Sequence, residues 1–370
     1  MRDVVEELAG FEGRGACTDA ERRAALWLHD DLRRRGYEAW VETVWVRPQW
    51  TGSLLLHAGL GVTASLVSVA APYPALAVAV VLVLSYGLEV AGLGGGLLRL
   101  AYRRATQLVV VEPPEPGKIA LLITAHTDAP RHGLLFRERW RRWGARLRPG
   151  PLAWVVGLLI CVVVVAGLRA TGAEGRVLGA AQMVPTLLLL LAAATALDLL
   201  LSRWTPGASD GASGVAVALA LHEELTRRAP QRLSAGLVLT GAGELFPFGF
   251  RHHLRAERPD PRESVVLEVG ACGAGDPAWS AGHPQLAAAA GDSGRARVNR
   301  PTATGAARSR RIPALFARAH GRGAIPPRVR TEHDTAAATD EAAMDATYGH
   351  LLDTVDRLDA ALVNAAATTA

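Results

Sequence analysis

Four long apolar runs interrupt an otherwise polar chain. They cover residues 53–71, 73–95, 151–168 and 177–201. Each is close to the ~20 residues that an α-helix needs to cross a bilayer, and short turns join them in pairs. The pattern therefore predicts two transmembrane helical hairpins. For the first pair, a buried hairpin of core helices is the alternative, but Glu89 is its only ionisable acid, which favours the bilayer.

The remaining stretches have the periodicities of helices and strands in alternation. Helices are predicted at 1–9, 19–35, from Ser213 onward, near 313–320 and at 340–366, and strands at 38–46, 107–111, 118–125, 233–240 and 264–269. Several of these strands run into glycine-rich loops. This order predicts an α/β fold with a mixed, mostly parallel sheet flanked by helices, in which sites lie at the carboxyl ends of the strands.

The two hairpins interrupt this α/β domain. We expect residues 1–50 to form its first part, 51–98 the first hairpin, 99–150 the next strands with a basic segment, 151–202 the second hairpin and 203–370 the remainder of the domain. Because the number of spans is even, all parts of the α/β domain are expected on one side of the membrane.

The arginines indicate which side that is. Ten of them lie between the two hairpins, whereas the loops on the opposite side contain two, Arg169 and Arg176. Since loops rich in Arg and Lys stay on the cytoplasmic side, we expect an integral plasma (inner) membrane protein whose α/β domain is cytoplasmic. The basic stretch 131–148, directly before the second hairpin, is either a solvated amphipathic helix or a segment at the membrane surface.

Composition excludes some classes of function. The formal charge is +5, but Lys118 is the only lysine and no basic stripe is interleaved with aromatic residues, so no nucleic acid partner is expected. Cys17, Cys161 and Cys272 are far apart in the chain and form neither a disulfide framework nor a CxxC metal site. Their pattern favours a reducing compartment.

The glycine-rich stretch 205–225 carries the first candidate for chemistry. Asp210 lies in its loop, and a helix is predicted to open at about Ser213. One interpretation is structural, with Ser209 or Asp210 as the N-cap of that helix. The other is that Asp210 is a carboxylate bridging two metal ions, which requires further ligands in the surrounding sequence.

Such residues occur at the ends of other predicted elements. His126 and Asp128 follow the strand 118–125, Glu244 follows 233–240, Glu268 lies near the end of 264–269, and His350 precedes Asp353 and Thr354 in the last helix. Each alone is typical of a solvated loop. Together with Asp210 they are the mixed nitrogen and oxygen ligands that a pair of zinc ions uses, and Asp128 is placed to orient the His126 imidazole.

Five stretches in order, LLITAHTDAP, GASDGASGVAVAL, LVLTGAGELFPFG, ESVVLEVG and HLLDTVDRLD, resemble the co-catalytic di-zinc exopeptidases of metallopeptidase family twenty-eight. That family includes leucyl aminopeptidases, glutamate carboxypeptidases and glutaminyl cyclases. The resemblance covers most of residues 1–45 and the polar parts from 105 onward, and it leaves out the four apolar runs.

The resemblance implies a role for each candidate residue. His126 and Glu268 would bind one zinc ion, Glu244 and His350 the other, Asp210 would bridge the two ions, and Asp128 would support His126. Together the ions would activate a water for attack on a peptide bond.

Three departures from the family pattern bear on activity. Gly243 stands where the family has a general-base glutamate, unless a one-residue shift of the loop makes Glu244 the base. The family places its last histidine four residues before the aspartate of a DT pair, whereas His350 lies three before Asp353; His333 and Tyr348 are the alternatives. Gly211 replaces the usual asparagine after the bridging aspartate.

Three functions are consistent with these observations. The first is a membrane-anchored zinc-dependent exopeptidase, aminopeptidase-like, acting on peptides near the bilayer. The second, supported by Gly243, is a catalytically weak or inactive pseudo-peptidase that binds a peptide or protein. The third is a transport protein, supported by Glu89 and Asp198 within the apolar runs.

Overall fold

The computed structural model describes residues 1–92, 95–137, 151–294, 302–321 and 326–369. The chain forms two compact units. The α/β unit comprises Met1–Pro48, Arg104–His132 and Arg203–Ala370, and the apolar unit comprises Gln49–Arg103 and Gly133–Ser202. The end of the second predicted span, at 93–94, and most of the basic stretch, at 138–148, fall outside the described residues.

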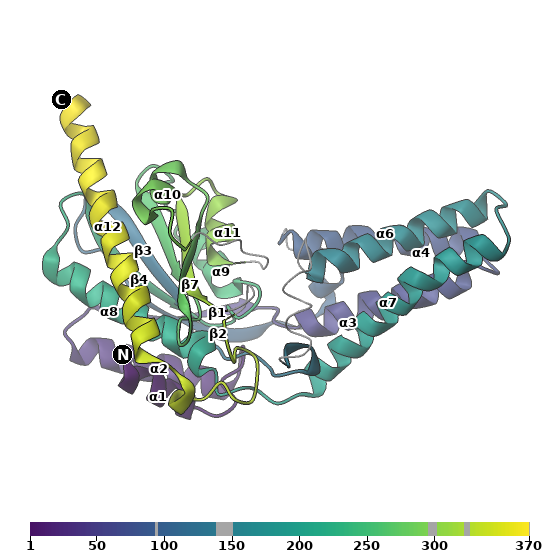
Figure 1. The fold of residues 1–370 in the computed structure, drawn as a ribbon, viewed down its shortest axis with the longest axis horizontal. Helices are drawn as coiled ribbons and strands as arrows, with labels where there is room; N and C mark the ends of the chain where they lie inside the picture. Colours follow the sequence, from purple (N-terminus) through teal and green to yellow (C-terminus); the bar gives the residue numbers. More distant parts are fainter. Residues whose placement is uncertain (93–94, 138–150, 295–301, 322–325, 370) are drawn as a thin grey trace. The chain divides into compact units, whose positions relative to one another are not determined.

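A seven-stranded sheet forms the centre of the α/β unit, in the order β1-β2-β4-β3-β5-β7-β6 (Figure 1). The strands are β1 (Ala39–Val46), β2 (Arg104–Val111), β3 (Ile119–His126), β4 (Leu233–Thr240), β5 (Ser264–Val269), β6 (Asp276–Ala281) and β7 (Ala314–His320). The pairs β3–β4, β3–β5 and β5–β7 are parallel, and β1–β2, β2–β4 and β6–β7 are antiparallel. The sheet is therefore mixed, as predicted, with parallel pairs at its centre and antiparallel pairs on either side.

Helices cover both faces of this sheet (Figure 1). On one face pack α1 (Arg2–Gly10), α2 (Asp19–Arg34), α8 (Ser213–Arg228), α10 (Pro284–Ala290) and α12 (Glu341–Thr369). On the other pack α9 (Phe248–Ala256) and α11 (Ala303–Arg308). Residues along β2 alternate between the two cores: Val109 and Val111 face the first, Leu108 and Val110 the second. Such alternation follows from the two-residue period of a strand.

Two local predictions are wrong. Residues 313–320 form the strand β7 rather than a helix: Ala, Leu and Arg favour a helix, but pairing with β5 and β6 overrides that propensity. Helix α8 does open at Ser213, but its N-cap is Ala212 with no side-chain cap, so neither Ser209 nor Asp210 caps it. These two residues lie instead in the kinked segment η3 (Ala208–Ala212).

The apolar unit contains four long helices, α3 (Trp50–Val67), α4 (Pro72–Val90), α6 (Pro151–Ala170) and α7 (Arg176–Leu201), with the short turns η1 (Leu97–Leu100) and η2 (Leu134–Phe136). All four are long and apolar enough to cross a membrane. Many of their large apolar side chains are exposed, Leu66, Val81, Leu84 and Leu191 among them. That is the pattern expected of helices that face lipid.

Both acids that supported the transport interpretation have structural partners. Glu89 accepts hydrogen bonds from Ser53 Oγ (2.5 Å) and from the backbone N–H of Leu98 (2.7 Å). Asp198 accepts one from the backbone N–H of Leu134 (2.7 Å). Each acid therefore accepts a hydrogen bond from a backbone N–H of a short helical turn, which gives buried Glu89 and half-buried Asp198 a structural role.

The links to the apolar unit all leave the α/β unit at one edge of the sheet. Val46, at the end of β1, pairs with Arg104, at the start of β2, while His126 and Leu108 both pair with Thr240, at the end of β4. The loops after β3, β4 and β5 also lie at this edge, which we call the carboxyl edge. The candidate residues of these loops therefore belong to one region.

Candidate functional site

Asp128 fixes the loop that follows β4. The structure buries it completely, and its two carboxylate oxygens accept hydrogen bonds from the backbone N–H groups of Gly243 (2.8 Å) and Glu244 (3.1 Å). A Cβ atom on Gly243 would lie 2.6 Å from Cβ of His126. The loop can therefore approach β3 this closely only because residue 243 has no side chain.

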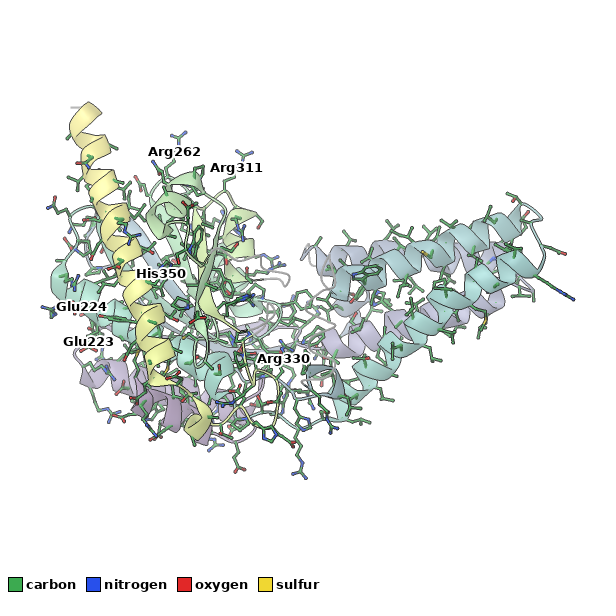
Figure 2. The ribbon with its side chains drawn as sticks, viewed as in Figure 1. Glu223, Glu224, Arg262, Arg311, Arg330 and His350 are labelled. Atoms are coloured by element: carbon green, nitrogen blue, oxygen red, sulfur yellow. The ribbon has the colours of Figure 1, made fainter. Side chains whose placement is uncertain are left out.

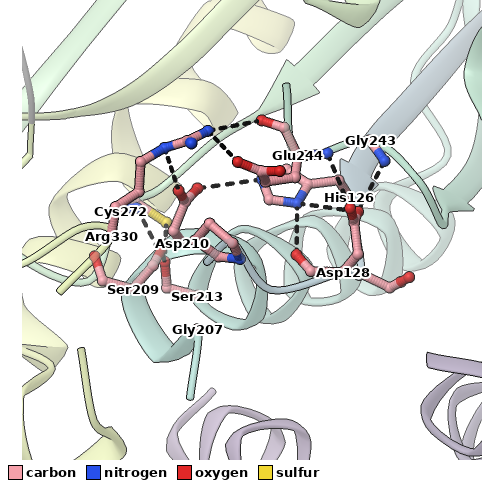
Figure 3. A network of polar contacts seen from close by, with 12 residues as sticks. His126, Asp128, Gly207, Ser209, Asp210, Ser213, Gly243, Glu244, Cys272 and Arg330 are labelled. Carbon is pink, nitrogen blue, oxygen red and sulfur yellow. Dashed lines mark hydrogen bonds and ion pairs between the residues drawn. The ribbon is translucent and has the colours of Figure 1, made fainter. Parts of the chain in front are cut away.

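His126 lies between two carboxylates (Figure 3). Its Nδ1 is 3.0 Å from the backbone oxygen of Asp128 and 3.5 Å from Oδ1 of that residue, and its Nε2 is 3.3 Å from Oδ1 of Asp210. Burial alone would lower the pKa of His126, but the contacts with Asp128 and Asp210 outweigh it and raise the pKa to about 10. Both carboxylates therefore favour the protonated form of the imidazole.

The chain reaches Asp210 through an unusual backbone. Asp210 has φ −97° and ψ 96° inside η3, and Gly211 has φ 114°. A Cβ atom on Gly211 would also lie 2.9 Å from the backbone oxygen of Asp128. Both observations require glycine, which explains why Gly211 stands where the resembled family usually has asparagine.

Asp334 holds the same segment from the other side. Its carboxylate accepts hydrogen bonds from the backbone N–H groups of Ser209 (2.6 Å) and Asp210 (3.1 Å). Burial raises the pKa of Asp334 to about 7, and the nearby Asp210 carboxylate adds to the rise. The segment after β7 thus positions Asp210. The sequence alone did not indicate that this segment contributes to the site.

Arg330 brings a guanidinium group into the site. Its Nη2 forms an ion pair with Oε1 of Glu244 and lies 3.5 Å from the backbone oxygen of that residue, and its Nε lies 4.0 Å from Oδ2 of Asp210 (Figure 3). The side chain is only 9% exposed. Arg330 also has φ 63°, a left-handed conformation that costs about 1–2 kcal/mol for a residue with a side chain. Its contacts with the two carboxylates hold it there.

The position of Arg330 in the sequence is informative. A second DT pair, Asp334 and Thr335, precedes the one at 353–354, and Arg330 lies four residues before Asp334. By the spacing of the resembled family, an arginine therefore stands where that family has its last histidine. The two DT pairs are alike in sequence, and only the contacts of Asp334 with η3 identify the pair that belongs to the site.

The residues predicted as the last ligand lie elsewhere. His350 is a half-buried residue part-way along α12, well apart from Arg330 (Figure 2). Asp353 lies 3.7 Å from Arg357 on the same helix, and Thr354 Oγ1 donates to the backbone oxygen of His350. Of the two alternatives, His333 has a side chain that is 79% exposed, and Tyr348, itself on α12, is half-buried against the main core.

Glu268 also has another partner. Its Oε2 accepts hydrogen bonds from the backbone N–H (2.7 Å) and the hydroxyl (2.5 Å) of Thr304 in α11. Its strand position, paired with Thr124, is two residues before His126 in register. Within the described part of the chain, Glu268 is engaged with α11 rather than with His126 or Asp210.

Two buried charges that sequence analysis missed support the loops. Arg14 donates to the backbone oxygens of Thr127, Pro206 and Gly207, and so joins the loop after β3 to η3. Glu21 accepts from the backbone N–H groups of Cys17 and Ala242 and from Thr106 Oγ1, each at 2.8 Å. Burial lowers the pKa of Arg14 to about 10 and raises that of Glu21 to about 8. The sequence did not mark them as site residues, because candidates were sought at the ends of predicted strands and both of these residues precede the first strand.

No family model and no curated protein matches the chain. Among solved structures, it is similar to a Zn-dependent exopeptidase from Parabacteroides distasonis, with a TM-score of 0.53 and 12% identity over 97% of this chain and 96% of that chain. A glutaminyl cyclase from Bacteroides thetaiotaomicron has a TM-score of 0.54 at 12% identity, with 96% of each chain covered. A leucine aminopeptidase precursor from the same organism has a TM-score of 0.53 at 12% identity, covering 96% of this chain and 95% of that one.

The fold resembles that of zinc-dependent exopeptidases. This likeness confirms, for the fold, the relationship inferred from the five sequence stretches. At 12% identity it concerns the fold alone, because one fold can carry many chemistries. What the site can do depends on the residues at its centre.

Those residues do not fit a pair of zinc ions. The Arg330 guanidinium already forms an ion pair with Glu244 and lies 4.0 Å from Asp210, the two carboxylates that were to contact the second ion. In the described part of the chain, no three His, Cys, Asp or Glu residues are grouped to hold a metal ion. The basic residues Arg14, His126 and Arg330 instead balance the buried carboxylates, as buried charges require.

Proposed function

We propose that this chain is a membrane-anchored binding module, in which a domain of exopeptidase fold binds a peptide or protein without hydrolysing it. The observation that carries the proposal is the Arg330 guanidinium between Asp210 and Glu244. A guanidinium neutralises carboxylates, but it offers no open coordination position at which a water could be activated. The second support is Gly243, which leaves the general-base position without a carboxylate.

Membrane anchoring rests on the apolar unit. Its four helices have the length and composition of spans, and the arginine distribution favours a cytoplasmic α/β unit in the inner membrane. The chain passes from the loop after β3 into the apolar unit after His132 and returns to the α/β unit at Arg203. The proposed partners are therefore the lipid bilayer and a peptide or protein recognised close to it.

A second candidate is the zinc-dependent exopeptidase itself. The contact of His126 with Asp210 and the support of the Glu244 loop by Asp128 favour it, because both would also serve a metal site. In that case zinc would have to displace Arg330 from both carboxylates.

A hydrolysis assay separates the two candidates. The full chain, purified in detergent, is incubated with a panel of aminoacyl nitroanilides in the presence of zinc. We expect no hydrolysis above the level of the Asp210→Ala variant. A rate well above that variant, lost on chelation of the metal, would overturn the binding-module proposal in favour of the exopeptidase. Binding itself is checked by thermal shift with unprotected dipeptides, for which a rise in Tm is expected.

A further inference from the structure

A cavity of about 490 Å³ opens at the edge of the sheet opposite to the carboxyl edge. Ile119 and Ser264, the first residues of β3 and β5, lie in its wall, and Pro313 precedes β7 there. Its volume is within the range of small-molecule sites, about 300–1,000 Å³. None of the residues of the candidate site lines it, so it is a separate feature of the α/β unit.

The interior of this cavity is aliphatic. Val265, Leu286 and Leu358 are buried in its wall, and Leu362 on α12 is half-buried beside them. These residues come from a strand and two helices that pack against one another in the main core. Because rigid elements supply the wall, the cavity is formed before a ligand arrives, which lowers the cost of binding.

Two arginines stand at its mouth. Arg262 and Arg311 both line the cavity and are exposed, and both project from the same end of the α/β unit (Figure 2). Over the described ranges, neither forms an ion pair with an acid. Asp260 instead accepts from the backbone N–H of Arg262 (2.8 Å), and Asp359 accepts from the backbone N–H groups of residues 231–233.

The polar lining has one sign of charge. Besides the arginines it contains His283, Gln285 and Ser264, all of which can donate a hydrogen bond, and its lining includes no carboxylate from the described residues. Arginine pairs bind carboxylate and phosphate oxygens in a forked geometry. An aliphatic interior with unpaired arginines at the mouth is complementary to a ligand with an apolar body and an anionic end.

We propose that this cavity binds a small aliphatic oxyanion, with its chain against Leu286 and Leu358 and its carboxylate or phosphate between Arg262 and Arg311. The proposal is independent of whether the carboxyl edge hydrolyses peptides, because it shares no residue with that site. It adds a small-molecule ligand to a chain whose other proposed partners are a peptide and the bilayer.

Calorimetric titration of the detergent-purified full chain tests this proposal, with empty micelles as the blank. The probes are sodium hexanoate, hexyl phosphate, acetate and hexylammonium. We expect saturable binding of hexanoate or hexyl phosphate, at least tenfold weaker binding of acetate, and none of hexylammonium. The better of the first two probes identifies the head group as carboxylate or phosphate.

Substitutions locate the binding. Arg262→Gln and Arg311→Gln are each expected to weaken it tenfold or more, and Leu362→Glu to weaken it by placing a negative charge at the wall. Arg33→Gln, an exposed arginine on α2, is the matched control and should bind as the natural chain does. The absence of saturable binding of both anions, or equal affinity in the two arginine variants and the control, would overturn the proposal.

Discussion

The two edges of the sheet differ in whether their charged side chains have partners of opposite charge. At the carboxyl edge, buried carboxylates lie beside buried basic groups: Arg330 pairs with Glu244 and approaches Asp210, and His126 lies between Asp210 and Asp128. At the opposite edge, Arg262 and Arg311 face an apolar cavity without an acidic partner among the described residues. The charged residues of the carboxyl edge are therefore paired within the chain. The two arginines of the opposite edge have no acidic partner among the described residues, so an anionic ligand can pair with them.

This difference changes the expected place of function. Charged residues at the carboxyl ends of parallel strands normally indicate chemistry, yet here the charges stabilise one another. Burial of a charge is tolerated when a partner is present, and removal of that partner is then costly. Substitution of an arginine should therefore have a large effect on stability at the carboxyl edge and a small effect at the opposite edge.

The largest effect is expected for Arg330→Ala. It leaves Glu244 buried without its ion-pair partner and leaves Asp210 with its contact to His126. Removing one partner of a buried ion pair typically destabilises a protein by about 3–5 kcal/mol. Denaturant unfolding measures the loss. The control is Arg328→Ala, an exposed arginine two residues earlier, which should cost far less. Equal losses in the two variants would contradict the role of Arg330 as the structural cation of the site.

A second large effect is expected for Gly243→Ala. The new Cβ would lie 2.6 Å from Cβ of His126, so the loop must move away from Asp128. Overpacking of this kind costs about 1–3 kcal/mol. Gly349→Ala on α12 is the control, because no atom lies within 4 Å of its Cβ position and alanine favours a helix. Thermal unfolding should show a lower Tm for the first variant and an unchanged or higher Tm for the second.

A moderate effect is expected from pH, through Glu21. Burial, with a contribution from Asp128, raises the pKa of Glu21 to about 8 from an ordinary value of 4.5. The folded protein therefore keeps a proton that the unfolded chain releases, and stability from this group is full below pH ~4.5 and lost as pH rises through ~8. We expect Tm to fall between about pH 5 and 8, and Glu21→Gln to reduce that slope. A slope unchanged from that of the exposed control Glu6→Gln would contradict the assignment.

The smallest effect on stability is expected at the opposite edge. Arg262→Gln and Arg311→Gln remove exposed side chains without an acidic partner among the described residues, so each should change the free energy of unfolding by no more than about 0.5 kcal/mol. Denaturant unfolding checks this value. A loss comparable to that of Arg330→Ala would show that these arginines hold the fold together and are not available to a ligand.

Some elements could be predicted almost to the residue. The strands β4 and β5 have the predicted bounds, since each is a buried apolar run that ends in a glycine-rich loop. The four apolar helices could also be predicted, from their length and composition. Strand β7 was not, because Ala314–His320 has no β-branched residue and its pairing with β5 and β6 is non-local. The segment after it was also not recognised as part of the site.

The site was predictable in its first half only. His126, Asp128, Asp210 and Glu244 follow strands or open a helix, so their positions at one sheet edge can be inferred from the order of elements. Arg330 does not follow directly after a predicted strand or open a predicted helix. In a chain with many arginines, nothing in the sequence marks this one as a residue of the site. The choice between the DT pairs at 334 and 353 depends on a contact between Asp334 and η3, two segments more than a hundred residues apart.

The central claim is that an arginine, rather than metal, holds the carboxylates of the carboxyl edge. Elemental analysis of the detergent-purified chain tests it most directly, with Arg330→His and the control Arg328→His purified in parallel. The account predicts less than one zinc ion per chain in the natural protein and in the control, and a gain of zinc only in Arg330→His. About two zinc ions per natural chain, lost in Asp210→Ala, would contradict it.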